Sequence, residues 1–211
     1  MGIQERRERE RGARRQAVLE AARRLLRERG FNGTTTRQIA AACELSEATL
    51  FFYFRTKDEI FTSLLLEGID FMGRGIEEIA AASLAPTEKL TRLWEFFGEV
   101  RRERPEYFHV FSYLAHPRST AAVSDEAKAE LARRSGDNFR RFSALLGEIL
   151  PVPEPRLCAD LLWAAFVGLM VLRDSRLNLG APPHPTEPQL RAALDLLISG
   201  ISPRSKGGRK R

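Results

Sequence analysis

The chain has 211 residues, enough for a substantial hydrophobic core in one large or two small domains. An apolar content of 43% and a charged content of 29% suit a soluble globular protein. Its two cysteines, Cys43 and Cys158, form no metal-binding spacing, which favours a reducing cytoplasm over a disulfide scaffold. No signal peptide is expected, because the charged start MGIQERRERERGARR has no apolar run behind it.

The net charge of +6 is unevenly distributed. Residues 1–57 contain 13 basic and 7 acidic residues, whereas residues 58–202 contain 16 basic and 21 acidic residues. Residues 203–211 contain five basic residues and no acid. This asymmetry predicts a nucleic-acid-binding N-terminal unit on an acidic body, followed by a disordered basic tail. The tail either adds affinity for any DNA or is an ordinary solvated end.

The first predicted helix covers residues 4–30. Its apolar stripe consists of Val18, Ala21, Ala22, Leu25 and Leu26 at helical spacing, and Gly30 is a suitable stop. Ahead of the stripe, Arg6 to Arg15 form either a solvated, salt-bridged helix end or an arm that contacts DNA phosphates. The interleaved acids Glu5, Glu8 and Glu10 favour the solvated end.

Two short helices follow, over residues 36–43 and 47–53, joined by a turn at Glu44-Leu45. Ser46 is a suitable N-cap for the second helix, and Glu47 suits the positive end of its dipole. Leu50 and Phe54 share one buried face. Two helices with such a short connection predict a helix-turn-helix, whose second helix can enter a DNA major groove.

This segment resembles the DNA-binding domain of the TetR family of bacterial regulators. The resemblance covers roughly residues 14–61 and rests on Ala21-Ala22, Leu25-Leu26, Gly30-Phe31, Ile39-Ala40, Leu45-Ser46, Ala48-Thr49-Leu50, Phe52-Tyr53-Phe54 and Lys57-Asp58-Glu59-Ile60. Two residues depart from the family pattern. Glu44 stands where Gly is usual, and Phe51 stands where a Tyr hydroxyl usually reaches a phosphate.

The predicted DNA-binding residues are Thr36, Arg37, Glu47, Ala48, Thr49, Phe51, Phe52, Tyr53 and Lys57. Thr49 and Phe52 suit base edges and thymine methyl groups, whereas Thr36, Arg37, Tyr53 and Lys57 suit phosphates. Three consecutive aromatic residues cannot all face one core, so at least one is expected on the DNA side. Phe51 either turns inward or faces the DNA backbone.

The rest of the chain predicts further helices over residues 57–83, 88–103, 106–115, 119–150, 154–179 and 187–201. Proline-containing connections separate several of them, and no convincing strand is present. The predicted fold is therefore all-α, with about nine helices. Residues 1–57 are expected to form the helix-turn-helix domain, residues 58–202 a larger ligand-binding and dimerisation domain, and residues 203–211 the tail.

The apolar run at residues 161–172 is too short to span a bilayer, so no membrane contact is expected. The last two helices have more apolar surface than one bundle can bury, unless both are internal core. The family resemblance implies that they pair with those of a second copy. The predicted dimer contacts are Leu162, Phe166, Leu169, Leu190, Leu194 and Leu197.

Aromatic residues from several helices predict either plain core or an apolar effector pocket. The candidates are Phe71, Trp94, Phe97, Phe108, His109, Phe111, Tyr113, Phe142, Trp163 and Phe166. The resemblance implies a homodimeric repressor that binds double-stranded operator DNA and a small-molecule effector. A non-sensing or architectural DNA-binding protein is the alternative. No enzyme, cofactor or metal site is expected, because no HExxH, CxxC or GxGxxG motif occurs.

Overall fold

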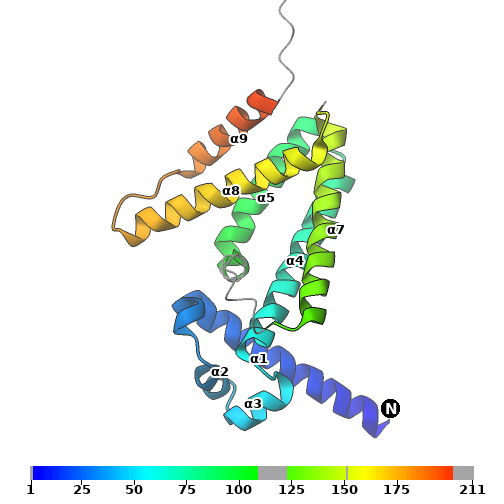
Figure 1. The fold of residues 1–211 in the computed structure, drawn as a ribbon, viewed down its shortest axis with the longest axis vertical. Helices are drawn as coiled ribbons and strands as arrows, with labels where there is room; N and C mark the ends of the chain where they lie inside the picture. The colour runs from blue at the N-terminus through cyan, green and yellow to red at the C-terminus, as the bar shows by residue number, and fades with distance from the viewer. Residues whose placement is uncertain (1, 109–122, 151, 202–211) are drawn as a thin grey trace, which may run out of the picture. The chain divides into compact units, whose positions relative to one another are not determined.

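The computed structural model describes residues 2–108, 123–150 and 152–201, and its secondary structure there is helical (Figure 1). The prediction of an all-α fold is confirmed. The helices with full bounds are α1 (Ile3–Gly33), α2 (Thr36–Ala42), α3 (Glu47–Tyr53), α4 (Lys57–Ala81), α5 (Pro86–Glu103), α7 (Asp125–Ile149), α8 (Pro155–Asn178) and α9 (Glu187–Ile201). The predicted helix 106–115 is helical at residues 105–108, and its remainder lies outside the described residues, as does the basic tail.

The described chain forms two compact units. Unit 1 contains residues 1–71 and 100–134, and unit 2 contains residues 72–99 and 135–211. Helices α4, α5 and α7 contribute residues to both units. Unit 1 therefore comprises more of the chain than the segment 1–57 that was expected to form the DNA-binding domain.

The core of unit 1 is built around the apolar stripe of α1. Its buried side chains, from Val18 to Leu26, pack with Ile39 of α2, Leu50 of α3 and Leu64 of α4. Gly30 has φ 66°, which breaks the regular helix where the sequence predicted a stop. The hydroxyl of Thr34, itself fully buried, donates to the carbonyl of Gly30 at 2.8 Å and closes this end of α1.

Local side-chain bonds fix the helix-turn-helix. Thr35 begins α2 through a capping box with Gln38, in which each side chain accepts a hydrogen bond from the other residue's backbone N–H. Between the helices, Glu44 adopts φ 57°, the left-handed conformation for which the family usually has Gly. The hydroxyl of Ser46 accepts from the N–H of Thr49 at 3.1 Å and caps α3 as predicted.

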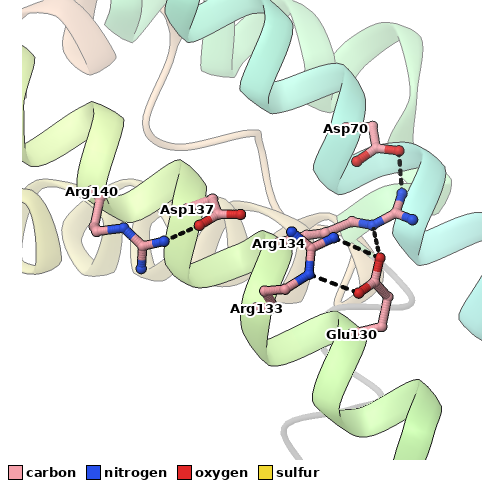
Figure 2. Close-up of polar contacts among 6 residues, drawn as sticks. All are labelled: Asp70, Glu130, Arg133, Arg134, Asp137 and Arg140. Atoms are coloured by element: carbon pink, nitrogen blue, oxygen red, sulfur yellow. Dashed lines mark hydrogen bonds and ion pairs between the residues drawn. The ribbon is translucent and has the colours of Figure 1, made fainter.

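Charged side chains connect the segments of unit 1 that lie far apart in sequence. The guanidinium of Arg134 on α7 pairs with Glu130 at 2.6 Å and with Asp70 of α4 at 2.5 Å, and Arg133 also donates to Glu130 (Figure 2). On α1, Arg23 pairs with Glu67 of α4 and lies 3.6 Å from the buried Glu106. These pairs join α1, α4, α7 and residues 105–108 within one unit.

Unit 2 has an aromatic centre. Phe97 of α5 lies 5.3 Å from Trp163, 5.5 Å from Phe166 and 5.7 Å from Phe142, measured between ring centroids. The indole Nε1 of Trp94 donates to the carbonyl of Leu190 at 2.9 Å, which attaches α9 to α5. The contacts of Phe97 with Trp163 and Phe142 are edge-to-face, a geometry that stabilises a core beyond its buried area.

One helix boundary differs clearly from the sequence prediction. The sequence predicts a helix from residue 119, whereas α7 begins at Asp125, and Val123 and Ser124 are not helical. The hydroxyl of Ser124 accepts from the N–H of Ala127 at 3.2 Å. Ser124 therefore acts as the N-cap, and hydroxyl caps of this kind define where a helix starts.

Candidate nucleic-acid interface

Helix α3 presents one buried and one exposed face. Leu50 is fully buried in the core of unit 1, whereas Phe52 is 69% exposed and Phe51 40% exposed. Ala48 and Thr49 are also exposed, and Glu47 is half-buried at the start of the helix. Large aromatic side chains of a soluble domain are usually buried, so an exposed pair on a short helix indicates a contact surface.

Thr49 is held in place by the cap of α3. Its hydroxyl lies 2.8 Å from the hydroxyl of Ser46, and its backbone N–H donates to the same oxygen. The side chain therefore has a fixed position on the exposed face of the helix. Its methyl and hydroxyl groups suit the thymine methyl and the polar base edges of a major groove.

The aromatic end of α3 divides between core and solvent. Tyr53 is half-buried and meets Phe52 edge-on at 5.4 Å between ring centroids. Phe54, directly after α3, is fully buried. The expectation that the aromatics at 51–53 cannot all face the core is thus met, and Phe51 does not turn inward.

Two predicted phosphate ligands lie on α2. Arg37 is exposed and Thr36 is half-buried, next to the cap residue Thr35. A cation and backbone amides at a helix start suit a phosphate. Thr35 was not among the residues predicted from the sequence, although its position three residues before Gln38 is the spacing of a capping box.

Lys57, whose phosphate contact stays a prediction, packs against the end of α1. Its ammonium donates to the carbonyl of Phe31 at 2.7 Å and lies 4.1 Å from the centroid of the Phe31 ring. Burial lowers the pKa of this ammonium, an effect that Asp58 opposes. Lys57 therefore attaches the start of α4 to the end of α1.

Arginines of α1 contact the exposed end of α3, an arrangement that was not predicted from the sequence. The guanidinium of Arg11 lies 5.6 Å from the centroid of the Phe52 ring. Arg15 donates to the carbonyl of Tyr53 and lies 4.0 Å from the centroid of Phe54. The positive charge of α1 therefore lies directly beside the exposed aromatics.

The predicted effector-pocket residues fall into three groups. Trp94, Phe97, Phe142, Trp163 and Phe166 are brought together at the centre of unit 2. Phe71 and Phe108 belong to unit 1, where Phe71 packs near Tyr107 at 6.3 Å between ring centroids. His109, Phe111 and Tyr113 lie outside the described residues.

Helix α8 is two-faced within one chain. Cys158, Ala159, Leu162, Phe166 and Met170 are buried. The opposite face consists of exposed residues three or four positions apart, here called the α8 stripe: Leu157, Leu161, Ala164, Gly168 and Leu172. By length and composition α8 could cross a membrane, a test that core helices of soluble proteins also pass.

Several of the predicted dimer contacts are buried, whereas contacts with a partner chain require exposed side chains. Leu162, Phe166, Leu190 and Leu194 are buried inside their own chain and have no surface left for a partner. Leu169 and Leu197 are partly exposed, whereas Leu196 of α9 is 73% exposed. Helix geometry explains the difference, because neighbouring residues such as Leu161 and Leu162 point to different faces of α8.

Within the described ranges, no group of three His, Cys, Asp or Glu side chains is arranged to hold a metal ion. Both described cysteines are free thiols, and burial raises the pKa of each. The candidate binding surfaces of the described chain are the exposed face of α3, the arginines beside it, and the aromatic centre and α8 stripe of unit 2.

Known proteins resemble this chain in sequence. Residues 18–64 match the family model for bacterial regulatory proteins of the tetR family. The transcriptional repressor Rv1474c of Mycobacterium tuberculosis is 35% identical over 200 residues, which are 90% of this chain and 93% of that protein. The repressor KstR2 of Mycolicibacterium smegmatis is 28% identical over 82 residues, which are 39% of this chain and 40% of that protein.

Solved structures resemble it in fold. AibR in complex with isovaleryl coenzyme A and operator DNA has a TM-score of 0.62 at 19% identity, covering 88% of this chain and 98% of that one. FadR from Bacillus subtilis in complex with stearoyl-CoA has a TM-score of 0.65 at 18% identity, with the same coverage. A TetR family regulator from Marinobacter aquaeolei also gives 0.65, at 24% identity, covering 94% of this chain and 100% of that one.

Proposed function

The chain belongs to the TetR family of bacterial regulatory proteins, and we propose that it is a dimeric transcriptional repressor. In this proposal α3 binds a palindromic operator in double-stranded DNA. A small, largely apolar ligand that binds in unit 2 releases the protein from the operator. The protein acts in the cytoplasm, where its operator lies. Repression, rather than activation, is supported by the related repressor that matches along 93% of its own length.

The observation that carries the proposal is the exposed face of α3. Thr49 and Phe52 project from a helix whose Leu50 is fully buried, so the core of unit 1 holds the exposed residues in place. Such a helix contacts few base pairs, and useful affinity needs two copies about one helical turn of DNA apart, roughly 34–36 Å. A palindromic operator follows from the two-fold symmetry of the dimer.

The α8 stripe supports dimerisation. Leu157, Leu161 and Leu172 are each about half exposed, and the centre of the stripe is small, at Ala164 and Gly168. Nothing in the described chain lies within 4 Å of a Cβ added at Gly168, so a partner helix has room to approach. We propose that the stripe and Leu196 of α9 form the interface, together with the partly exposed Leu169 and Leu197.

The aromatic centre of unit 2 supports an apolar ligand. Two proteins of similar fold are described with acyl-coenzyme A compounds, whose acyl chains are apolar. The rings around Phe97 come from α5, α7 and α8, so inserting an acyl chain among them would separate these helices. A ligand alters DNA binding only if it binds the DNA-competent and incompetent states with different affinities.

Selection of DNA from a random pool on the purified full-length protein tests the proposal. Thr49→Ala should weaken binding to the selected duplex by about 1–3 kcal/mol and affect random duplex much less, and Phe52→Ala should behave alike. The cap of α3 survives Thr49→Ala, because Ser46 bonds to the backbone N–H of that residue. Gln16→Ala, an exposed change on α1, is the matched control.

The results separate the alternatives. An architectural DNA-binding protein would yield no preferred sequence from the pool, and Thr49→Ala would then weaken all duplexes equally. Addition of isovaleryl-CoA or stearoyl-CoA to the selected complex tests the effector class by fluorescence anisotropy. Release by an acyl-CoA, with free coenzyme A as the control, supports the sensing function, and retention of DNA with every acyl-CoA contradicts this ligand class.

A further inference from the structure

Helix α1 is longer than the core it packs against. Its buried side chains begin at Val18, whereas every residue from 4 to 17 is exposed or half-exposed. Figure 1 shows this N-terminal half projecting beyond α2 and α3, the helices of the same unit. An exposed helical half of this length needs either strong intrinsic propensity or a partner, because most helical stability comes from packing.

The face of α1 that packs on the core continues as arginine. Arg7, Arg11, Arg14 and Arg15 precede Val18 by eleven, seven, four and three residues, spacings that put side chains on one helical face. We call these four residues the arginine face. Arg6 and Arg9 lie on the opposite side, where Arg6 pairs with Glu10 at 2.8 Å.

Few ion pairs involve the arginine face within the described residues. Among the residues that the structure describes, no carboxylate pairs with Arg7, Arg11 or Arg14. Arg15 lies 4.0 Å from Glu59, but its main contact is the carbonyl of Tyr53. Glu8 stands three residues before Arg11 and Glu10 four residues before Arg14, so these acids border the arginine face. In the described structure Glu10 is turned to Arg6 instead.

Contacts with α3 fix where the arginine face lies. The guanidinium of Arg11 lies over the ring of Phe52, the most exposed aromatic of α3, and Arg15 donates a hydrogen bond to the last residue of that helix. The remaining members, Arg7 and Arg14, share the face and are exposed. A duplex bound by α3 would therefore place its phosphates next to the same face.

We propose that the arginine face of α1 contacts the phosphate backbone beside the groove that α3 occupies. This inference rests on the proposed DNA binding by α3. The helix rises by about 1.5 Å per residue, so the dozen residues before Arg15 reach roughly 18 Å, more than the major-groove width of about 12 Å. Guanidinium groups suit phosphates, and such contacts add affinity without sequence preference.

The test compares two double variants of the full-length protein. Arg7→Gln with Arg14→Gln removes two charges from the arginine face and spares Arg11 and Arg15, which contact α3. Arg6→Gln with Arg9→Gln removes two charges from the opposite face of the same segment. Affinities for a duplex selected on the wild-type protein, and for random duplex, are measured by fluorescence anisotropy at several salt concentrations.

We expect the first pair to weaken binding to both duplexes by similar factors. The slope of log affinity against log salt should fall by about 1.8 per bound protomer, because each lost phosphate contact removes about 0.9. The second pair should change the slope by less than half as much. Hydroxyl-radical footprints should lose backbone protection at the edges of the site only with the first pair.

Other outcomes contradict the inference. Equal slope changes for both pairs would indicate a general charge effect, and unchanged slopes would place no phosphate at this face. A change in sedimentation of the first pair without DNA would identify the partner as a second copy. Failure of the wild-type protein to select or retain any duplex would instead contradict the proposed function, which distinguishes the two.

Discussion

The carboxylate of Glu106 lies 3.6 Å from Nε of Arg23, and it is fully buried. Neither of its oxygens accepts a hydrogen bond from the described residues, nor does that Nε donate one. Arg27 lies 3.7 Å away on its other side. The pair is therefore desolvated without the hydrogen bonds that usually offset desolvation.

Replacing each partner should have unequal effects. Arg23→Met leaves Glu106 buried beside Arg27 alone and should reduce the free energy of unfolding by about 3–5 kcal/mol. Glu106→Gln should reduce it by less than about 1 kcal/mol, because Arg23 keeps Glu20 and Glu67 as partners. Urea unfolding at one protein concentration, followed by circular dichroism, measures both. Equal losses of unfolding free energy for Arg23→Met and Glu106→Gln would mean that the two side chains form a satisfied ion pair.

Lys57→Met should destabilise unit 1 rather than change the electrostatics of DNA binding. The substitution removes the hydrogen bond to Phe31 and the contact with its ring, together worth about 1–2 kcal/mol. The salt dependence of DNA binding should stay unchanged. Arg37→Met is the comparison, since this exposed residue should lower the salt slope by about 1 without loss of stability. A lower salt slope for Lys57→Met, with a loss of stability for Arg37→Met instead, would assign the phosphate contact to Lys57.

Phe51→Tyr should leave stability unchanged within about 0.5 kcal/mol, because the ring is 40% exposed and a hydroxyl can meet water. The added hydroxyl should tighten binding to selected and random duplexes alike, as a phosphate contact does. Thermal unfolding and anisotropy measure the two effects. Tighter binding to the selected duplex alone would assign Phe51 to a base rather than to the backbone.

Leu161→Glu should convert dimers to monomers without unfolding the chain. The residue is 50% exposed in one chain, and a charge there becomes unfavourable only when a partner covers it. Sedimentation velocity measures the oligomer, and DNA affinity should fall with it. Leu84→Glu, at a residue 40% exposed between α4 and α5, is the control. An unchanged dimer for Leu161→Glu would exclude the α8 stripe from the interface.

Protonation of Glu130 should lower the stability of the fold in acid. Hydrogen bonds from Arg133 and Arg134 lower the pKa of this carboxyl to about 2. A carboxyl with a lowered folded-state pKa stabilises the fold fully above the unfolded value of about 4.3 and loses that effect as pH falls toward 2. The stability difference between wild-type protein and Glu130→Gln should therefore be larger at neutral pH than near pH 3, by urea unfolding. A constant difference would contradict the linkage.

The helix-turn-helix could be predicted closely because local chemistry determines it. Ser46 caps α3 through an atom three residues away, and the predicted bounds of α3 match the structure. The contact of Lys57 with Phe31 depends on residues 26 positions apart, and no local pattern reports it. In α8 nearly every position is apolar, so the sequence could not distinguish the buried Leu162 from the exposed Leu161.

The N-cap at Ser124 could not be predicted either. The sequence from residue 119 contains several residues that could begin the helix, and the hydrogen bond from Ala127 identifies Ser124 as the cap. The arginine face was present in the sequence as a spacing, but it is hidden by alternating acids. Its position beside Phe52 depends on how α1 and α3 pack, through contacts between residues about 40 positions apart.

Both tryptophans of the chain, Trp94 and Trp163, lie in unit 2. Trp94 is bonded to the carbonyl of Leu190, and Trp163 packs against Phe97 and Phe166. Intrinsic tryptophan emission therefore follows the surroundings of these rings and the attachment of α9, while unit 1 contributes only tyrosine and phenylalanine. Excitation at the indole band gives an optical signal specific to unit 2 without any label, and a fluorophore attached near α3 would add an independent signal for unit 1.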